Sequence, residues 1–186
     1  MFAPRTLAMA LPLVLAPHVI HTPYPDAVVP AAVAGPAATA ALVGPPWISI
    51  EYPVNPYDAT TKGAFLVVHA FHHGTPTAFP VSGSAEGIVN GERRSVPLRF
   101  ATTSRTGTFA LTRQWPNEGT WTLVVSVAQG PEDRVSAIVD LTRSGDVAAI
   151  RVPTRQHEGH TLPAAVAMSE VEQSLRQRAA QLSAVR

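Results

Sequence analysis

The segment Ala64-Phe-Leu-Val-Val-His-Ala-Phe71 decides the fold of this chain. It is apolar at nearly every position and shorter than an ordinary helix, so it predicts a strand that is buried on both faces. A second segment, Trp121-Thr-Leu-Val-Val-Ser-Val127, places its large apolar side chains at every other position, on one face of a strand. We therefore expect a central strand over residues 64–71 that faces residues 121–127 across a hydrophobic core.

Outward from these two segments, a period of two continues through residues 47–152. Turn signals separate the apolar runs, and Asn90-Gly91 is the strongest hairpin dipeptide among them. No helix-length pattern intervenes, which disfavours parallel crossover units. The sequence thus predicts an all-β domain, an antiparallel immunoglobulin-like β-sandwich of seven to eight strands. The expected strands include residues 47–52, 64–71, 96–100, 109–111, 121–127, 135–141 and 147–152.

Residues 1–46 differ in composition from the rest of the chain. Eleven of the 18 prolines lie before residue 57, and Arg5 and Asp26 are the only formal charges before residue 51. Proline removes a backbone donor and disfavours helix at the preceding residue, so we expect an extended Pro/Ala-rich arm. The apolar run over residues 7–20 is also similar to a secretory leader or a short membrane span, although prolines interrupt it.

With only two formal charges, the arm is either a solvated, mobile leader or, because its apolar side chains are costly to leave in water, a segment that another surface covers. We expect a lipid surface, the protein's own core or a partner subunit to cover it. Its predicted partner-binding residues are Leu11, Leu13, Leu15, Val19 and Ile20.

The end of the chain predicts a linker over residues 153–162 and then an amphipathic α-helix over residues 163–186. Thr161 can cap the helix, and Pro163 suits its first turn. The apolar stripe of this helix can pack back on the domain, dock on another chain or lie on a membrane surface. Packing on the domain itself stays open as an alternative. We predict partner contacts at four stripe residues: Met168, Val171, Leu175 and Leu182.

Composition disfavours several classes of function. With 14 basic and 13 acidic residues the net charge is +1, which gives no electrostatic reason to bind nucleic acid. The chain has no cysteine, so disulfides, thiolate metal sites and cysteine nucleophiles are excluded. Neither a nucleophile elbow nor a phosphate-binding glycine loop with lysine is present. We therefore predict a protein that is not an enzyme, and no small-molecule substrate is identified.

Histidines are the candidates for metal chemistry. His69, His72 and His73 follow one another at the end of the central strand and could hold copper or zinc if the chain turns there. His157 and His160 form a second pair, in a segment that lacks the spacing of a helical zinc site. The main interpretation assigns no cofactor, and copper or zinc bound by the first cluster is its alternative.

The run Trp115-Pro-Asn-Glu-Gly-Thr-Trp-Thr-Leu-Val-Val-Ser-Val127, preceded by Gly107-Thr-Phe-Ala-Leu111, resembles the closing strands of bacterial immunoglobulin-like domains of the YtkA-like and FixH-like kind. The resemblance covers residues 47–142. It implies a setting near membrane electron-transfer or copper-handling systems, and it transfers no catalytic residue. The chain lacks the methionine cluster of the copper-carrying relatives, since its methionines lie far apart at positions 1, 9 and 168.

Together these observations predict an accessory or assembly subunit of a larger complex, membrane-bound and respiratory or photosynthetic. It would bind other protein subunits through its arm and its terminal helix. A periplasmic or cell-envelope location is expected. The alternative is a periplasmic copper- or zinc-binding β-sandwich.

Overall fold

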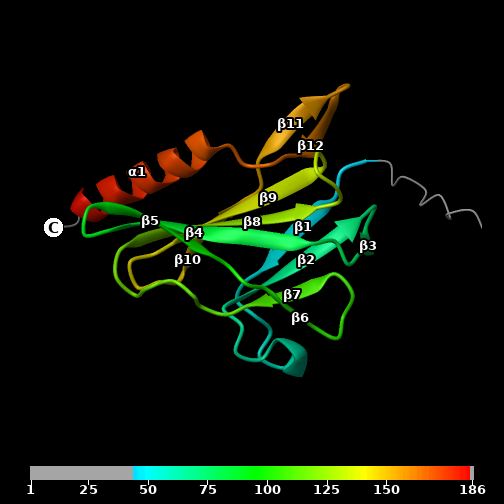
Figure 1. Cartoon of the computed structure of the whole chain (residues 1–186), viewed down its shortest axis with the longest axis horizontal. Coiled ribbons are helices and arrows are strands. Elements are labelled where there is room, and N and C mark those ends of the chain that lie inside the picture. Colours follow the sequence, from blue (N-terminus) through cyan, green and yellow to red (C-terminus); the bar gives the residue numbers. More distant parts are fainter. Residues whose placement is uncertain (1–43, 185–186) are drawn as a thin grey trace, which may run out of the picture. The chain divides into compact units, whose positions relative to one another are not determined.

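Two antiparallel sheets dominate the computed structural model, which describes residues 44–184 and the side chains of residues 44–180 (Figure 1). The strands of the first sheet are β1 (Trp47–Glu51), β2 (Leu66–His72), β3 (Thr75–Pro76), β6 (Ala101–Thr102) and β7 (Thr108–Leu111). Those of the second are β4 (Val81–Val89), β5 (Glu92–Pro97), β8 (Thr120–Ala128), β9 (Arg134–Leu141) and β10 (Val147–Arg151). The first sheet has the order β1-β2-β7-β6, with β3 beside β2, and the second has the order β10-β9-β8-β4-β5.

The two sheets share one hydrophobic core. Leu66, Val68 and Ala70 of β2 belong to it, and all three are 0% exposed. The inward face of β8 contributes Trp121, Leu123, Val125 and Val127 to the same core. Both segments predicted as core strands are therefore confirmed, and each lies between two neighbours in its sheet. The mostly β, antiparallel architecture with one C-terminal helix is also confirmed.

The described residues contain twelve strands rather than the seven or eight expected. The most important addition is β4, a central strand of the second sheet whose glycines and polar residues hide any apolar alternation. Its glycines are required by close packing. A Cβ at Gly87 would lie 2.4 Å from the Trp121 ring, and one at Gly83 would lie 2.3 Å from the Val124 carbonyl oxygen.

Tight turns connect the hairpins. Asn90 and Gly91, between β4 and β5, have φ angles of 52° and 83°, so the predicted hairpin turn is confirmed. Positive φ at both central residues is the signature of a type I′ turn, which suits the twist of antiparallel strands. The same pattern occurs at His73-Gly74, between β2 and β3, with φ angles of 48° and 78°.

The segment expected to be a linker forms a hairpin instead. Strands β11 (Thr154–His157) and β12 (His160–Pro163) pair in a separate two-stranded sheet. The helix α1 (Met168–Ala184) consequently begins at Met168 rather than at residue 163. The cap is also not Thr161, because Thr161 pairs with Gln156 in the hairpin. Glu170 instead accepts a hydrogen bond of 2.8 Å from the Ala167 backbone N–H at the start of the helix.

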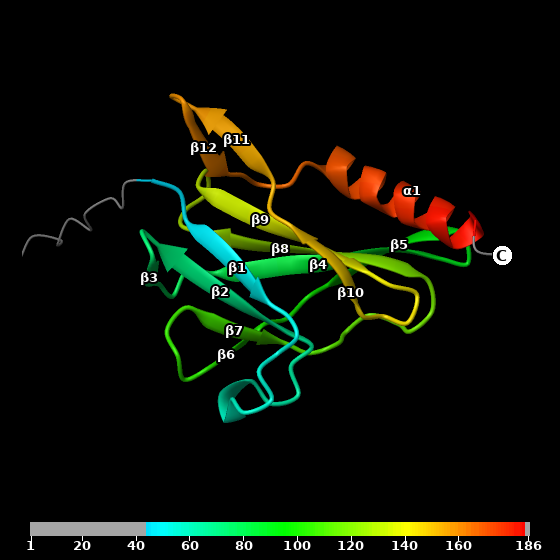
Figure 2. The ribbon, with the colours of Figure 1, turned by 180° about the vertical axis from the view of Figure 1, so that it is seen from behind.

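Helix α1 lies on the outer face of the second sheet, against β8 and β4 (Figure 2). Val171 and Leu175 are both 0% exposed, so their assignment as partner contacts is corrected: they pack on this chain's own sheet. Met168 is 61% exposed. The side chain of Leu182 lies outside the described part, as do the five predicted contacts of the arm. Within residues 44–184, no helix combines the length and apolar character needed to cross a bilayer.

Candidate functional site

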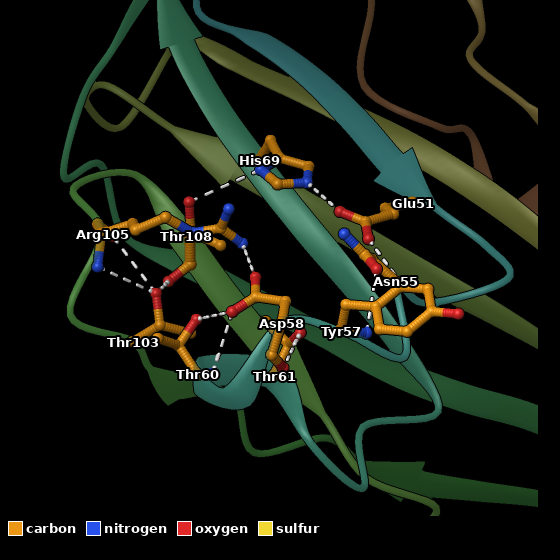
Figure 3. Close-up of polar contacts among 10 residues, drawn as sticks. All are labelled: Glu51, Asn55, Tyr57, Asp58, Thr60, Thr61, His69, Thr103, Arg105 and Thr108. Atoms are coloured by element: carbon orange, nitrogen blue, oxygen red, sulfur yellow. Dashed lines mark hydrogen bonds and ion pairs between the residues drawn. The ribbon is translucent and has the colours of Figure 1, made fainter.

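A polar cluster lies on the outer face of the first sheet, beneath the loop that joins β1 to β2 (Figure 3). The even-numbered residues of β2 face the core, so His69 points to the opposite side. Thr108 of β7 is the register partner of His69, and Glu51 is two residues beyond Ser49, which pairs with His69 on β1. Strand periodicity therefore brings a carboxylate, an imidazole and a hydroxyl together. We call these three residues the Glu51–His69–Thr108 cluster.

The hydrogen bonds of the cluster follow one direction. His69 Nε2 lies 2.9 Å from Glu51 Oε2, and because an ionised carboxylate only accepts, the imidazole N–H donates. The other ring nitrogen, Nδ1, is then the acceptor for the Thr108 hydroxyl at 3.5 Å, the outer limit of a hydrogen bond. The side chains of His69 and Glu51 are 21% and 29% exposed. The imidazole is therefore oriented from both sides and still reaches solvent.

An ion pair fastens the covering loop to the loop between β6 and β7. Asp58 is the N-cap of the short 3-10 helix η1 (Ala59–Thr61) and accepts from the Thr60 backbone N–H at 2.9 Å and the Thr60 hydroxyl at 2.7 Å. The same carboxylate forms an ion pair with Arg105, which comes from the loop between β6 and β7. Two loops far apart in sequence are thus joined over the outer face (Figure 3).

Hydrogen bonds lower the pKa of both carboxyl groups. The Asn55 backbone N–H, followed by the His69 imidazole, holds the pKa of Glu51 below its ordinary value. For Asp58 the Thr60 hydroxyl is the main cause of a lowered pKa, followed by the Thr60 backbone N–H. Donors that favour the charged form of an acid have this effect. Both residues are therefore acceptors for their neighbours at neutral pH.

The order of acid, imidazole and hydroxyl is the order found in nucleophilic relays. Here, however, Thr108 is only 6% exposed, so its hydroxyl is covered. A hollow of about 230 Å³ has Thr108, Arg105, Phe79 and Phe109 among its lining residues. It is smaller than the roughly 300–1,000 Å³ of usual small-molecule sites. The arrangement orients the His69 imidazole between a carboxylate and a hydroxyl, and the burial of Thr108 disfavours a nucleophilic role for that hydroxyl.

The structure separates the three histidines of the predicted metal cluster. His72 is on the core-facing side of β2 and its ring lies 6.1 Å from that of Phe79, whereas His69 is on the outer face. His73 begins the turn, and its ring centroid is 4.2 Å from that of His72. The turn expected near Gly74 is present, but it brings only His72 and His73 together. Among the described residues, no group of three or more His, Cys, Asp or Glu side chains is placed to hold a metal ion.

Sequence reasoning missed the exposed β11–β12 hairpin and the exposure of β10, which precedes it in the chain. Ile150 and Val152 are 38% and 36% exposed, and residues 154–161 are exposed without exception. The hairpin is polar on both faces, so hydrophobic periodicity does not reveal it. The signal that could have found it is Glu158-Gly159 between two short polar runs, where the φ angles are 49° and 79°.

Comparison with known proteins leaves the family open. No family model, no curated protein and no solved structure matches this chain.

Proposed function

We propose that this chain is a non-enzymatic accessory or assembly subunit that binds other protein subunits of a larger, membrane-associated complex. Its body would be a β-sandwich of the immunoglobulin-like kind, which the two antiparallel sheets around a shared core support. The observation that carries the proposal is the uncovered hairpin formed by β11 and β12.

This hairpin has regular pairing but almost no burial. Its strands pair with each other alone, over four register pairs. It is fixed at its base, where Ala164 N–H donates to Pro153 and Ser136 N–H donates to Ala164. Both views show it projecting beyond the two main sheets (Figures 1 and 2). A two-stranded hairpin gains little stability alone in water, so a surface that covers it would stabilise it.

The adjacent edge strand extends this surface. β10 is one of the two edge strands of the second sheet, and its residues after Val147 are exposed. Arg151 is the only charged residue of β10, whereas edge strands that avoid pairing usually carry several charges or prolines. An extended partner segment could add to this edge by main-chain hydrogen bonds, with Ile150 as an apolar contact.

The terminal segments complete the proposal. Because α1 is packed on its own sheet, the partner contacts move from the helix stripe to the hairpin, β10 and Met168. The apolar arm residues Leu11, Leu13, Leu15, Val19 and Ile20 remain predicted contacts, and they are the reason for a membrane-associated, periplasmic or envelope setting.

The test shortens the hairpin. Thr154 and Pro163 are register partners, so replacing residues 155–162 by Asn-Gly closes the chain at the base without touching the sandwich. We expect the circular dichroism spectrum and Tm of this variant to change little. In the native membrane, a photoreactive residue at position 156 of the intact chain should cross-link to a partner protein. The shortened variant should no longer retain that partner protein. The matched control carries the photoreactive residue at position 132, in the exposed turn between β8 and β9.

The proposal is wrong if the shortened variant retains the same subunits as the intact chain. A second variant that lacks residues 1–43 tests the arm separately. Loss of the complex in this variant, with the sandwich still folded, would support the arm as a contact. Unchanged association in both variants would exclude an assembly role for both segments.

A further inference from the structure

We propose that the tip of the β11–β12 hairpin is a binding site for a divalent transition-metal ion, with His157 and His160 as its two protein ligands. This proposal does not depend on the partner-binding proposal. It concerns a different pair of histidines from the cluster at residues 69–73.

The pairing of the two strands places the two histidines directly opposite each other. His157 is the last residue of β11, His160 is the first residue of β12, and the two are register partners. Side chains directly opposite in an antiparallel pair lie on the same face, with their Cβ atoms about 4.5–5.5 Å apart. Metal–nitrogen bonds to histidine are about 2.0–2.1 Å long, so two imidazoles at this separation can converge on one ion.

The turn holds this geometry in place. Only Glu158 and Gly159 separate the two histidines, and their φ angles of 49° and 79° form a type I′ turn. The hydrogen bond between the Gln156 amide and the Thr161 hydroxyl, 2.8 Å long, links the next register pair. The two ligands therefore belong to a closed hairpin rather than to a loop of variable shape, which lowers the ordering cost of binding.

The surroundings suit a metal ion with open coordination positions. Both histidines are exposed, so water can complete the coordination shell. Glu158 contributes the negative charge at the tip, while Arg155 lies on the same face one step along β11. Imidazole ligands favour copper(II), nickel(II) and zinc(II), and copper(II) binds most tightly in this series. With only two protein ligands and one arginine nearby, we expect copper(II) to bind more tightly than zinc(II).

Metal titration of the full chain tests the site. Copper(II), buffered by glycine, and zinc(II) are titrated calorimetrically into the wild type and into the double variant His157→Ala/His160→Ala. The matched control is His18→Ala/His21→Ala, because these two histidines have the same spacing in the sequence and lie outside the described residues. We expect one equivalent of copper(II) to be lost, or its affinity to fall at least tenfold, in the hairpin variant alone. Equal stoichiometry and affinity in the wild type and the hairpin variant would overturn the proposal, and so would an absence of binding in the wild type.

A backbone variant tests whether the hairpin builds the site. Gly159→Val keeps both histidines, and a Cβ at this position meets nothing within 4 Å, but a φ of 79° strains a β-branched residue. We expect weaker binding, by about tenfold if the strain costs about 1.4 kcal/mol. Unchanged affinity in Gly159→Val would show that the histidines bind metal without the turn and would contradict the proposed site.

Discussion

Asp140 joins three elements through one buried carboxylate. It accepts hydrogen bonds from the Thr122 hydroxyl of β8 at 3.0 Å, from Arg151 of β10 at 3.0 Å and from the Ser174 hydroxyl of α1. At 7% exposure the charge is costly to bury, and these donors offset the cost. We predict that Asp140→Ala lowers the free energy of unfolding by about 2–4 kcal/mol, because it leaves buried donors without an acceptor. Urea denaturation measures the loss, with Glu132→Ala in an exposed turn as the control; a loss below about 1 kcal/mol would contradict this role.

The Glu51–His69–Thr108 cluster and the hydrogen bonds of Asp140 show why a site is harder to predict than a core. His69 could be singled out from the sequence because histidine is chemically distinctive. Its partner Glu51 is 18 positions away and is placed by strand register alone. Asp140 and Ser174 are 34 positions apart, and they meet only because α1 packs on the outer face of the second sheet, against β8 and β4. No local pattern records such distances, so the chemistry of single residues was predictable and their combination was not.

At the scale of elements, β4 is the strand whose glycines make room for its neighbour. The Trp121 ring lies over Gly87, its register partner, and its Nε1 donates to the Glu118 carbonyl at 2.8 Å, so the ring cannot move aside freely. We predict that Gly87→Ala destabilises the domain by about 1–3 kcal/mol through overpacking. Gly130→Ala is the matched control, because a Cβ there meets nothing within 4 Å and its φ is not positive. Similar effects of the two substitutions on Tm would show that the close contact is not limiting.

The elements also differ in how visible they are in the sequence. Strands β2 and β8 were predicted because their apolar periodicity records burial directly. The β11–β12 hairpin and β4 were not, since the first buries almost nothing and the second satisfies its packing with glycine. The apolar stripe of α1 predicted an amphipathic helix, but the same stripe fits a partner and the chain's own sheet equally well. Val171 and Leu175 are buried on the chain's own second sheet, which is the surface that the short connection to α1 brings near them.

For the whole molecule, the two carboxyl groups over the first sheet predict acid sensitivity. Glu51 and Asp58 both have a pKa lowered by hydrogen bonds in the folded protein, so the unfolded chain takes up protons at a higher pH than the folded chain does. Their stabilisation is therefore fully present above the ordinary carboxyl pKa of about 4 and is lost as the pH falls through the lowered values.

At pH 7, Glu51→Gln/Asp58→Asn should lower Tm by about 2–4 °C, a modest effect because both groups reach solvent. The difference from wild type should shrink as the pH falls below about 4 and disappear once both carboxyl groups are protonated in the folded chain. The control Glu132→Gln/Asp133→Asn removes the same charge from an exposed turn, and a pH dependence equal to that of the test variant would show that net charge, not the two loop contacts, sets acid stability.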